Sequence, residues 1–120
     1  MDVKCIVPVE KFRDYVLKPG ADQGKRQVFL SLEYAQEHSE QLAAIYKQQA
    51  AEQYACGNYL LGKKDRHGQR IIIEIILDGI NDRSEQKSYL SSGWMIINAE
   101  TIKLNTPFAG FSRSREQSND

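Results

Sequence analysis

The chain has 120 residues, of which 41% are hydrophobic and 27% are charged. This length and composition are those of one soluble globular domain, and they exclude a second independent core. The 16 Lys and Arg residues together balance the 16 Asp and Glu residues, so the formal net charge is zero. The chain therefore lacks the global positive charge that attracts many proteins to nucleic acids or anionic membranes. No apolar run approaches the ~20 residues that span a bilayer, so we expect no membrane partner.

The two cysteines, Cys5 and Cys56, lie far apart, and neither has a second cysteine or a histidine at the spacing of a metal site. The sequence therefore predicts neither a zinc site nor a disulfide framework. It also contains no motif of a hydrolase triad, of dinucleotide binding or of paired carboxylates at helical spacing. We expect no cofactor and no bound metal.

The first half of the chain carries helical signals. A proline suited to a first helical position, followed by apolar residues on one face, predicts a short helix over residues 8–18. Apolar residues at helical spacing predict a second short helix over residues 25–32. A longer third helix is predicted over residues 39–56, with a glycine directly after it as a C-terminal cap.

The second half has the composition of strands, which are predicted over residues 59–64, 70–77, 89–97 and 101–106. Helices followed by strands predict a single α+β domain over residues 1–111, with three N-terminal helices packed on one face of a roughly four-stranded antiparallel sheet. Residues 112–120 contain no apolar side chain, and we predict a disordered polar tail there.

The alternation along the most apolar strand assigns a core side to Ile71, Ile73, Ile75 and Leu77. Arg70 and Glu74 then lie on the opposite, open face. In the last strand the same alternation puts Lys103 on that open face and Thr106 on the core side. We therefore expect a mixed charged surface on one face of the sheet.

Lys25 follows a glycine at the start of the second predicted helix, on the same stripe as Phe29. The helix dipole disfavours a cation there, whereas free backbone N–H groups and a lysine together form a good phosphate site. The other interpretation is a lysine whose stem covers Phe29 and whose ammonium stays in water.

Two residues are candidate proton acceptors. His67, at the tip of the predicted hairpin, can act as an acid or base near neutral pH, but a solvated turn histidine is the alternative. Glu74 lies in an isoleucine-rich strand, where a carboxylate either pairs with a cation such as Arg70 or Lys103 or serves as a general base.

Four further residues are candidates for contacts with a nucleic acid. Trp94 is either a base-stacking residue or a core residue. Thr106 ends the last strand, where its hydroxyl either contacts a substrate phosphate or caps a turn. Arg70 and Lys103 are candidate cations for phosphate groups.

Several short motifs resemble those of small bacterial domains at the C-termini of polymorphic and contact-dependent-inhibition toxins: residues 7–17, Gly24-Lys25 with Phe29 and Tyr34, residues 93–96 and residues 103–107. Such domains are similar to the barnase, EndoU, colicin and RelE group of metal-independent ribonucleases. The resemblance covers roughly residues 3–113. It implies N-terminal helices against a four-stranded antiparallel sheet, with Lys25 and Thr106 at the site and Trp94 supporting the sheet.

The sequence thus leads to two hypotheses. The first is a metal-independent toxin domain that cleaves RNA, with tRNA as substrate, by driving a 2′-hydroxyl onto the neighbouring phosphodiester. Such a domain acts in the bacterial cytoplasm after delivery from a larger secreted protein and has a cognate immunity protein as partner. The second hypothesis is a non-catalytic protein-binding module, such as an immunity or adaptor protein, which the zero net charge favours.

Overall fold

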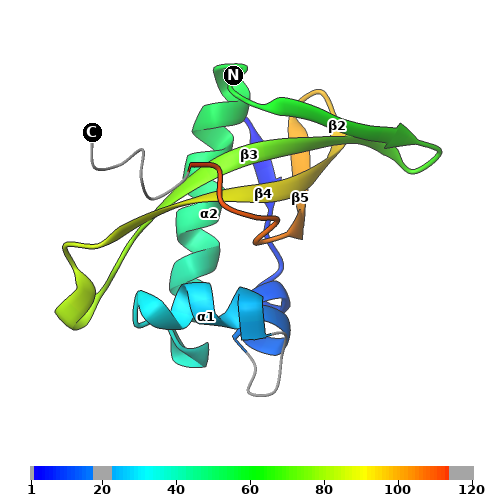
Figure 1. The fold of residues 1–120 in the computed structure, drawn as a ribbon. Coiled ribbons are helices and arrows are strands. Elements are labelled where there is room, and N and C mark those ends of the chain that lie inside the picture. Colours follow the sequence, from blue (N-terminus) through cyan, green and yellow to red (C-terminus); the bar gives the residue numbers. More distant parts are fainter. Residues whose placement is uncertain (1, 18–22, 114–120) are drawn as a thin grey trace.

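The computed structural model describes residues 2–17 and 23–113, except for the side chains of residues 23–25. Its helices and strands are, in chain order, β1 (Lys4–Ile6), η1 (Phe12–Val16), α1 (Gln23–Ser31), η2 (Gln36–His38), α2 (Ser39–Ala55), β2 (Leu60–Asp65), β3 (Gly68–Asp78), η3 (Asn81–Arg83), β4 (Lys87–Asn98) and β5 (Thr101–Thr106). The η1 segment is a π-helical turn, whereas η2 and η3 are short 3-10 helices. In Figure 1, α2 crosses behind the sheet, and α1 lies near the lower end of α2.

The strands of the described residues form one mixed sheet in the order β1-β5-β4-β3-β2. β1 runs parallel to β5, and all other neighbours are antiparallel. The predicted four-stranded antiparallel sheet was therefore wrong, because Lys4–Ile6 adds a fifth strand. Three residues are too few to show an alternating pattern. This strand forms because its backbone pairs with β5 and the side chain of its middle residue, Cys5, is buried in the core.

The prediction of three N-terminal helices was also wrong, since α2, with 17 residues, is the one long helix in the described part of the chain. α1 has nine residues. In the segment before it, the Leu17 N–H bonds the Phe12 carbonyl oxygen at 2.9 Å, five residues back. Helical segments this short depend on packing for their stability, and both of these side chains are buried.

The core lies between α2 and the sheet. All four apolar residues assigned to the core side of β3 are fully buried, which confirms the predicted alternation. Tyr46 of α2 is fully buried as well, with its ring centroid 4.9 Å from that of Phe12. Its hydroxyl donates to the Pro107 carbonyl oxygen at 2.8 Å. Because this buried hydroxyl has a partner, it also fixes α2 relative to the chain that follows β5.

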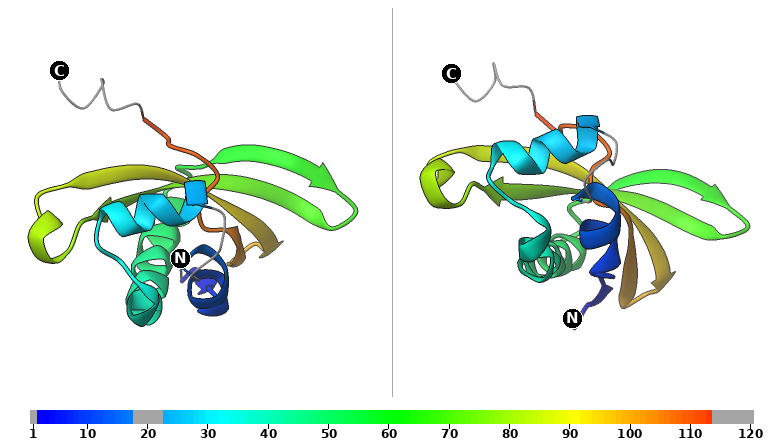
Figure 2. Two further views of the ribbon diagram at one scale, coloured as in Figure 1. Left: turned by 60° about the horizontal axis from the view of Figure 1, so that its bottom comes forward. Right: turned by 90° about the horizontal axis from the view of Figure 1, so that it is seen from below.

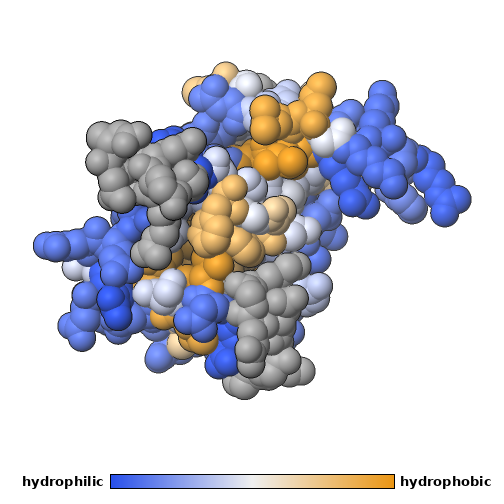
Figure 3. Space-filling model, in the orientation of Figure 1, coloured by the Kyte–Doolittle hydropathy of each residue, from blue (hydrophilic) through white to orange (hydrophobic). Residues whose placement is uncertain are grey.

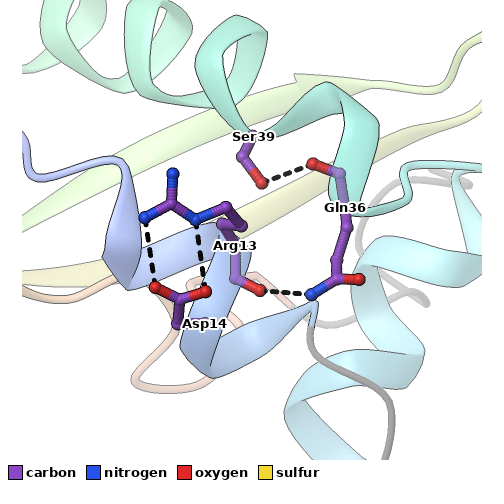
Figure 4. A network of polar contacts seen from close by, with 4 residues as sticks. All are labelled: Arg13, Asp14, Gln36 and Ser39. Atoms are coloured by element: carbon purple, nitrogen blue, oxygen red, sulfur yellow. Dashed lines mark hydrogen bonds and ion pairs between the residues drawn. The ribbon is translucent and has the colours of Figure 1, made fainter.

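A polar network joins η1 to the start of α2 (Figure 4). Gln36 Nε2 donates to the Arg13 carbonyl oxygen at 2.7 Å, and the Ser39 hydroxyl donates to the Gln36 carbonyl oxygen at 2.7 Å. The Arg13 guanidinium binds the Asp14 carboxylate through Nε and Nη2, each at 3.2 Å. The two bonds to backbone carbonyl oxygens satisfy groups that the short helical segments leave open.

Candidate functional site

The face of the sheet opposite α2, here called the outer face, carries the side chains that alternate with the buried ones. The strand register puts Arg70 of β3 opposite Met95 of β4, and Met95 opposite Lys103 of β5. Arg70 and Lys103 are both exposed. Because neighbouring strands lie about 4.8 Å apart, the backbones at these two cations are about 10 Å apart. Two of the predicted phosphate-binding residues therefore share one row of the outer face.

Glu74 lies on the outer face and is bound by the last residues that the structure describes. Its carboxylate accepts hydrogen bonds from Nε and Nη2 of Arg113, both at 2.9 Å, and from the Ser112 hydroxyl. The Arg113 guanidinium also lies over the Tyr89 ring, with Cζ 4.3 Å from the ring centroid. Glu74 thus forms an ion pair, as one interpretation of the sequence expected, but its partner comes from the segment predicted to be a tail.

The hydrogen bonds from Arg113 lower the pKa of Glu74 below its ordinary value of 4.5, although desolvation acts in the opposite direction. The carboxylate is therefore ionised at neutral pH. A general base must approach the proton that it removes to within about 3 Å, and three donors already bond the two oxygens of this carboxylate. The arrangement suits an anchor for residues 112 and 113 better than a base.

The C-terminal segment, residues 107–113, continues beside β4 beyond the end of β5 (Figure 1). Two backbone hydrogen bonds of 2.8 Å join Ser91 of β4 to Ala109 and Gly110. Of the tail predicted over residues 112–120, the first two residues make the carboxylate contacts just described. The others lie outside the described residues. The C-terminal segment therefore covers part of the outer face that the sequence analysis expected to be open.

Thr106 lies on the outer face instead of the predicted core side. A register shift between Gly93 and Trp94 pairs Thr106 with Gly93. A Cβ atom on Gly93 would lie 3.5 Å from the Thr106 Cβ atom, so the threonine side chain lies over this glycine. Gly93 alternates with the buried residues Ser92 and Trp94 and so belongs to the outer face. The irregular pairing reverses the alternation that a regular strand would have.

His67 lies at the tip of the β2–β3 hairpin, where its backbone N–H donates to Oδ1 of Asp65 at 2.8 Å. Its side chain is exposed. Glu74 follows seven residues later along the chain. β3 begins only at residue 68, and at about 3.3 Å per strand residue the two backbones are about 20 Å apart. The two predicted proton acceptors therefore do not share a site.

Two other predicted site residues lie elsewhere. Trp94 is fully buried on the core side, and its Nε1–H donates to the Ser92 hydroxyl at 2.8 Å. That hydroxyl donates in turn to the Ile73 carbonyl oxygen at 2.8 Å. Trp94 is therefore a core residue, one of the two alternatives given by the sequence, and a base at the surface cannot reach its ring. Lys25 belongs to α1, and its side chain lies outside the described part of the structure.

The β2–β3 arm, residues 60–70, projects beyond α2 (Figures 1 and 2). Its exposed cations are Lys63, Lys64, Arg66 and Arg70. At the base of the arm, Leu60 is 69% exposed and Leu61 is 73% exposed. Figure 3 shows apolar surface where β2 begins and hydrophilic surface over the projecting part. The hairpin was predicted from the sequence, but this surface was not. A Leu pair followed by a Lys pair within one predicted strand is the pattern that indicates it.

Within the described residues, no three or more His, Cys, Asp or Glu side chains are grouped so that they could hold a metal ion. Both cysteines are free, and burial raises the pKa of the Cys5 thiol to about 11. No helix in the described ranges is long and apolar enough to cross a membrane.

One protein family matches the sequence over most of its length. The model of the family described as "Domain of unknown function (DUF6883)" matches residues 2–110. The chain belongs to this family. No curated protein and no solved structure matches the chain. The family description names no activity, and it contains no reference to toxins or ribonucleases.

Proposed function

We propose that this chain is a non-catalytic protein-binding module whose partner docks on the β2–β3 arm. The observation that carries the proposal is the pair of exposed leucines, Leu60 and Leu61, beside the cationic part of the arm. Exposed apolar side chains with a polar rim are typical of protein interaction sites. The zero net charge also suits a protein partner, because a nuclease gains affinity and association rate from positive charge.

The outer face gives less support to RNA cleavage. Attack by a 2′-hydroxyl requires a base, an acid and cations around one phosphate. Arg70, Lys103 and Thr106 share the outer face, but Glu74 is held in an ion pair and His67 lies about 20 Å from it. A toxin domain with tRNA as substrate, an immunity protein as partner and the bacterial cytoplasm as its place of action therefore stays a prediction from the sequence.

Site-specific crosslinking tests the proposal. A photoreactive residue is placed at Leu61 of the full chain in the source organism, and a matched probe is placed at Ile97, which is 52% exposed on β4. We expect the Leu61 probe to give one protein adduct of defined mass and the Ile97 probe to give none. In parallel, the purified chain is incubated with total tRNA in chelator and is expected to leave the RNA intact.

The same two assays also define the result that would contradict the proposal. The proposal is contradicted if the Leu61 probe gives no protein adduct while the wild-type chain degrades RNA. Glu74→Gln and Lys25→Ala then serve as matched variants, since loss of cleavage in either of them would place that residue in a ribonuclease site.

A further inference from the structure

The far side of β2 is an edge of the sheet. Within the described residues β2 has β3 as its only neighbour, so alternate N–H and C=O groups of Leu60–Asp65 point away from the sheet. Proteins protect such edges with lysines and with bulges. The distal part of β2 has both, because the register shifts between Leu61 and Lys64. The proximal part, which holds Leu60 and Leu61, has neither. A strand that continues past the leucines must carry negative charge beside the lysines.

The register defines what a neighbouring strand would meet on each face. Leu60 pairs with Ile72 and therefore lies on the outer face, whereas Leu61 pairs with the buried Ile71 and lies on the other. Lys63 lies within the register shift, and Lys64 is the first residue after it. The Lys63 ammonium has only a 4.0 Å ion pair with Asp65, and Lys64 forms none among the described residues. A matching strand would carry apolar residues beside the leucines and carboxylates beside the lysines.

Other occupants of this edge fit less well. Nucleic-acid surfaces combine cations with several aromatic side chains on which bases stack, and residues 60–70 offer only His67, at the hairpin tip. A second copy of the chain, paired antiparallel through its own β2 about Gly62, would set each leucine opposite a lysine, which matches neither apolar nor oppositely charged side chains. An acidic and apolar segment has neither disadvantage.

We propose that β2 takes up an extended segment of a protein partner as one further antiparallel strand, and that this segment carries two acidic residues followed by apolar β-branched residues. The inference rests on the proposed protein-binding function and deepens it. Backbone hydrogen bonds to β2 supply affinity in this mode of recognition, and the alternating side chains supply specificity. An antiparallel partner reads, from its N-terminus, acidic residues at Lys64 and Lys63 and apolar residues at Leu61 and Leu60.

A peptide with the core Glu-Glu-Thr-Val-Ile tests the inference on the full chain. We expect saturable binding with a dissociation constant below about 1 mM. Amide hydrogen exchange should slow within Leu60–Asp65 and stay unchanged in Lys4–Ile6 of the other edge strand. The double variant Lys63→Glu/Lys64→Glu should weaken binding about tenfold and should prefer the charge-reversed core Lys-Lys-Thr-Val-Ile. Lys4→Glu, a single charge reversal on the other edge strand, is the control and should bind as the wild type does.

Failure of this inference differs from failure of the proposed function. If the Leu61 probe crosslinks a protein but no peptide slows exchange in β2, the strand-addition inference is wrong and the protein-binding proposal stands. If a single-stranded RNA of five nucleotides binds and the acidic peptide does not, the inference is also overturned, in favour of a polyanion site. Binding with exchange protection outside β2 overturns it as well.

Discussion

The body of the sheet and the β2–β3 arm differ sharply, although β3 runs through both. In the body, Ile71, Ile73 and Ile75 are fully buried against the helical layer. In the arm, β2 exposes most of its side chains on both faces, and its leucines contact little of the chain. A two-stranded hairpin without a covered face is marginally stable in water. The body therefore supplies the free energy of folding, and the arm is available for contacts outside the chain.

The largest effect is expected in the body. Ile75→Ala removes buried methyl groups at the centre of β3 and should reduce the free energy of unfolding by about 2–5 kcal/mol. Urea denaturation measures this loss, and Ile75→Val, with an expected loss of about 0.5–1.5 kcal/mol, gives a value if the alanine variant does not fold. A loss below about 0.5 kcal/mol in both variants would contradict the close packing of the body.

A smaller loss is expected from Ser92→Ala. The Ser92 hydroxyl accepts the Nε1–H of Trp94, and its removal leaves a buried donor without a partner, which costs about 1–3 kcal/mol. Ser91→Ala, on the outer-face side of the same strand, is the matched control and should stay within about 0.5 kcal/mol of the wild type. Equal losses in the two variants would show that the buried hydroxyl has no special role.

The sequence predicts those parts of the body that follow from local periodicity. The four buried positions of β3 and the long helix within residues 39–56 are confirmed, because alternation and helical spacing persist over many residues there. β1 could not be predicted, since three residues carry no periodic signal and pairing with β5 decides their conformation. The irregular pairing at Thr106 likewise depends on a neighbouring strand.

The candidate site is less accessible to sequence analysis than the core. Arg70 and Lys103 were placed correctly on one face because regular alternation holds between them. The contact between Arg113 and Glu74 was not predicted, because a polar segment without apolar residues resembles a disordered tail. The conformation of Arg113 depends on Glu74, which is 39 residues away in the chain. The exposed leucines were missed because composition alone does not distinguish a covered strand from a projecting one.

The ion pair of Glu74 predicts a modest dependence of stability on pH. Arg113 lowers the pKa of Glu74 in the folded state, so this contribution is complete above the ordinary value of 4.5 and is lost as the pH falls through the lower, folded-state pKa. The wild type should therefore lose more stability than Glu74→Gln between pH 7 and about pH 3. Denaturation of both proteins at the two pH values measures the difference. Parallel losses would contradict the ion pair.

The smallest effect on stability is expected in the arm. Leu61→Ser should change the free energy of unfolding by less than about 0.5 kcal/mol, because the side chain is 73% exposed in the folded state. The same variant should weaken binding of the Glu-Glu-Thr-Val-Ile peptide about fivefold, since the leucine becomes covered only when a strand is added. Urea denaturation and peptide titration measure the two quantities on one preparation. A variant that loses stability as strongly as Ile75→Ala would show that the arm packs against the body after all, and the distinction between the two regions would fail.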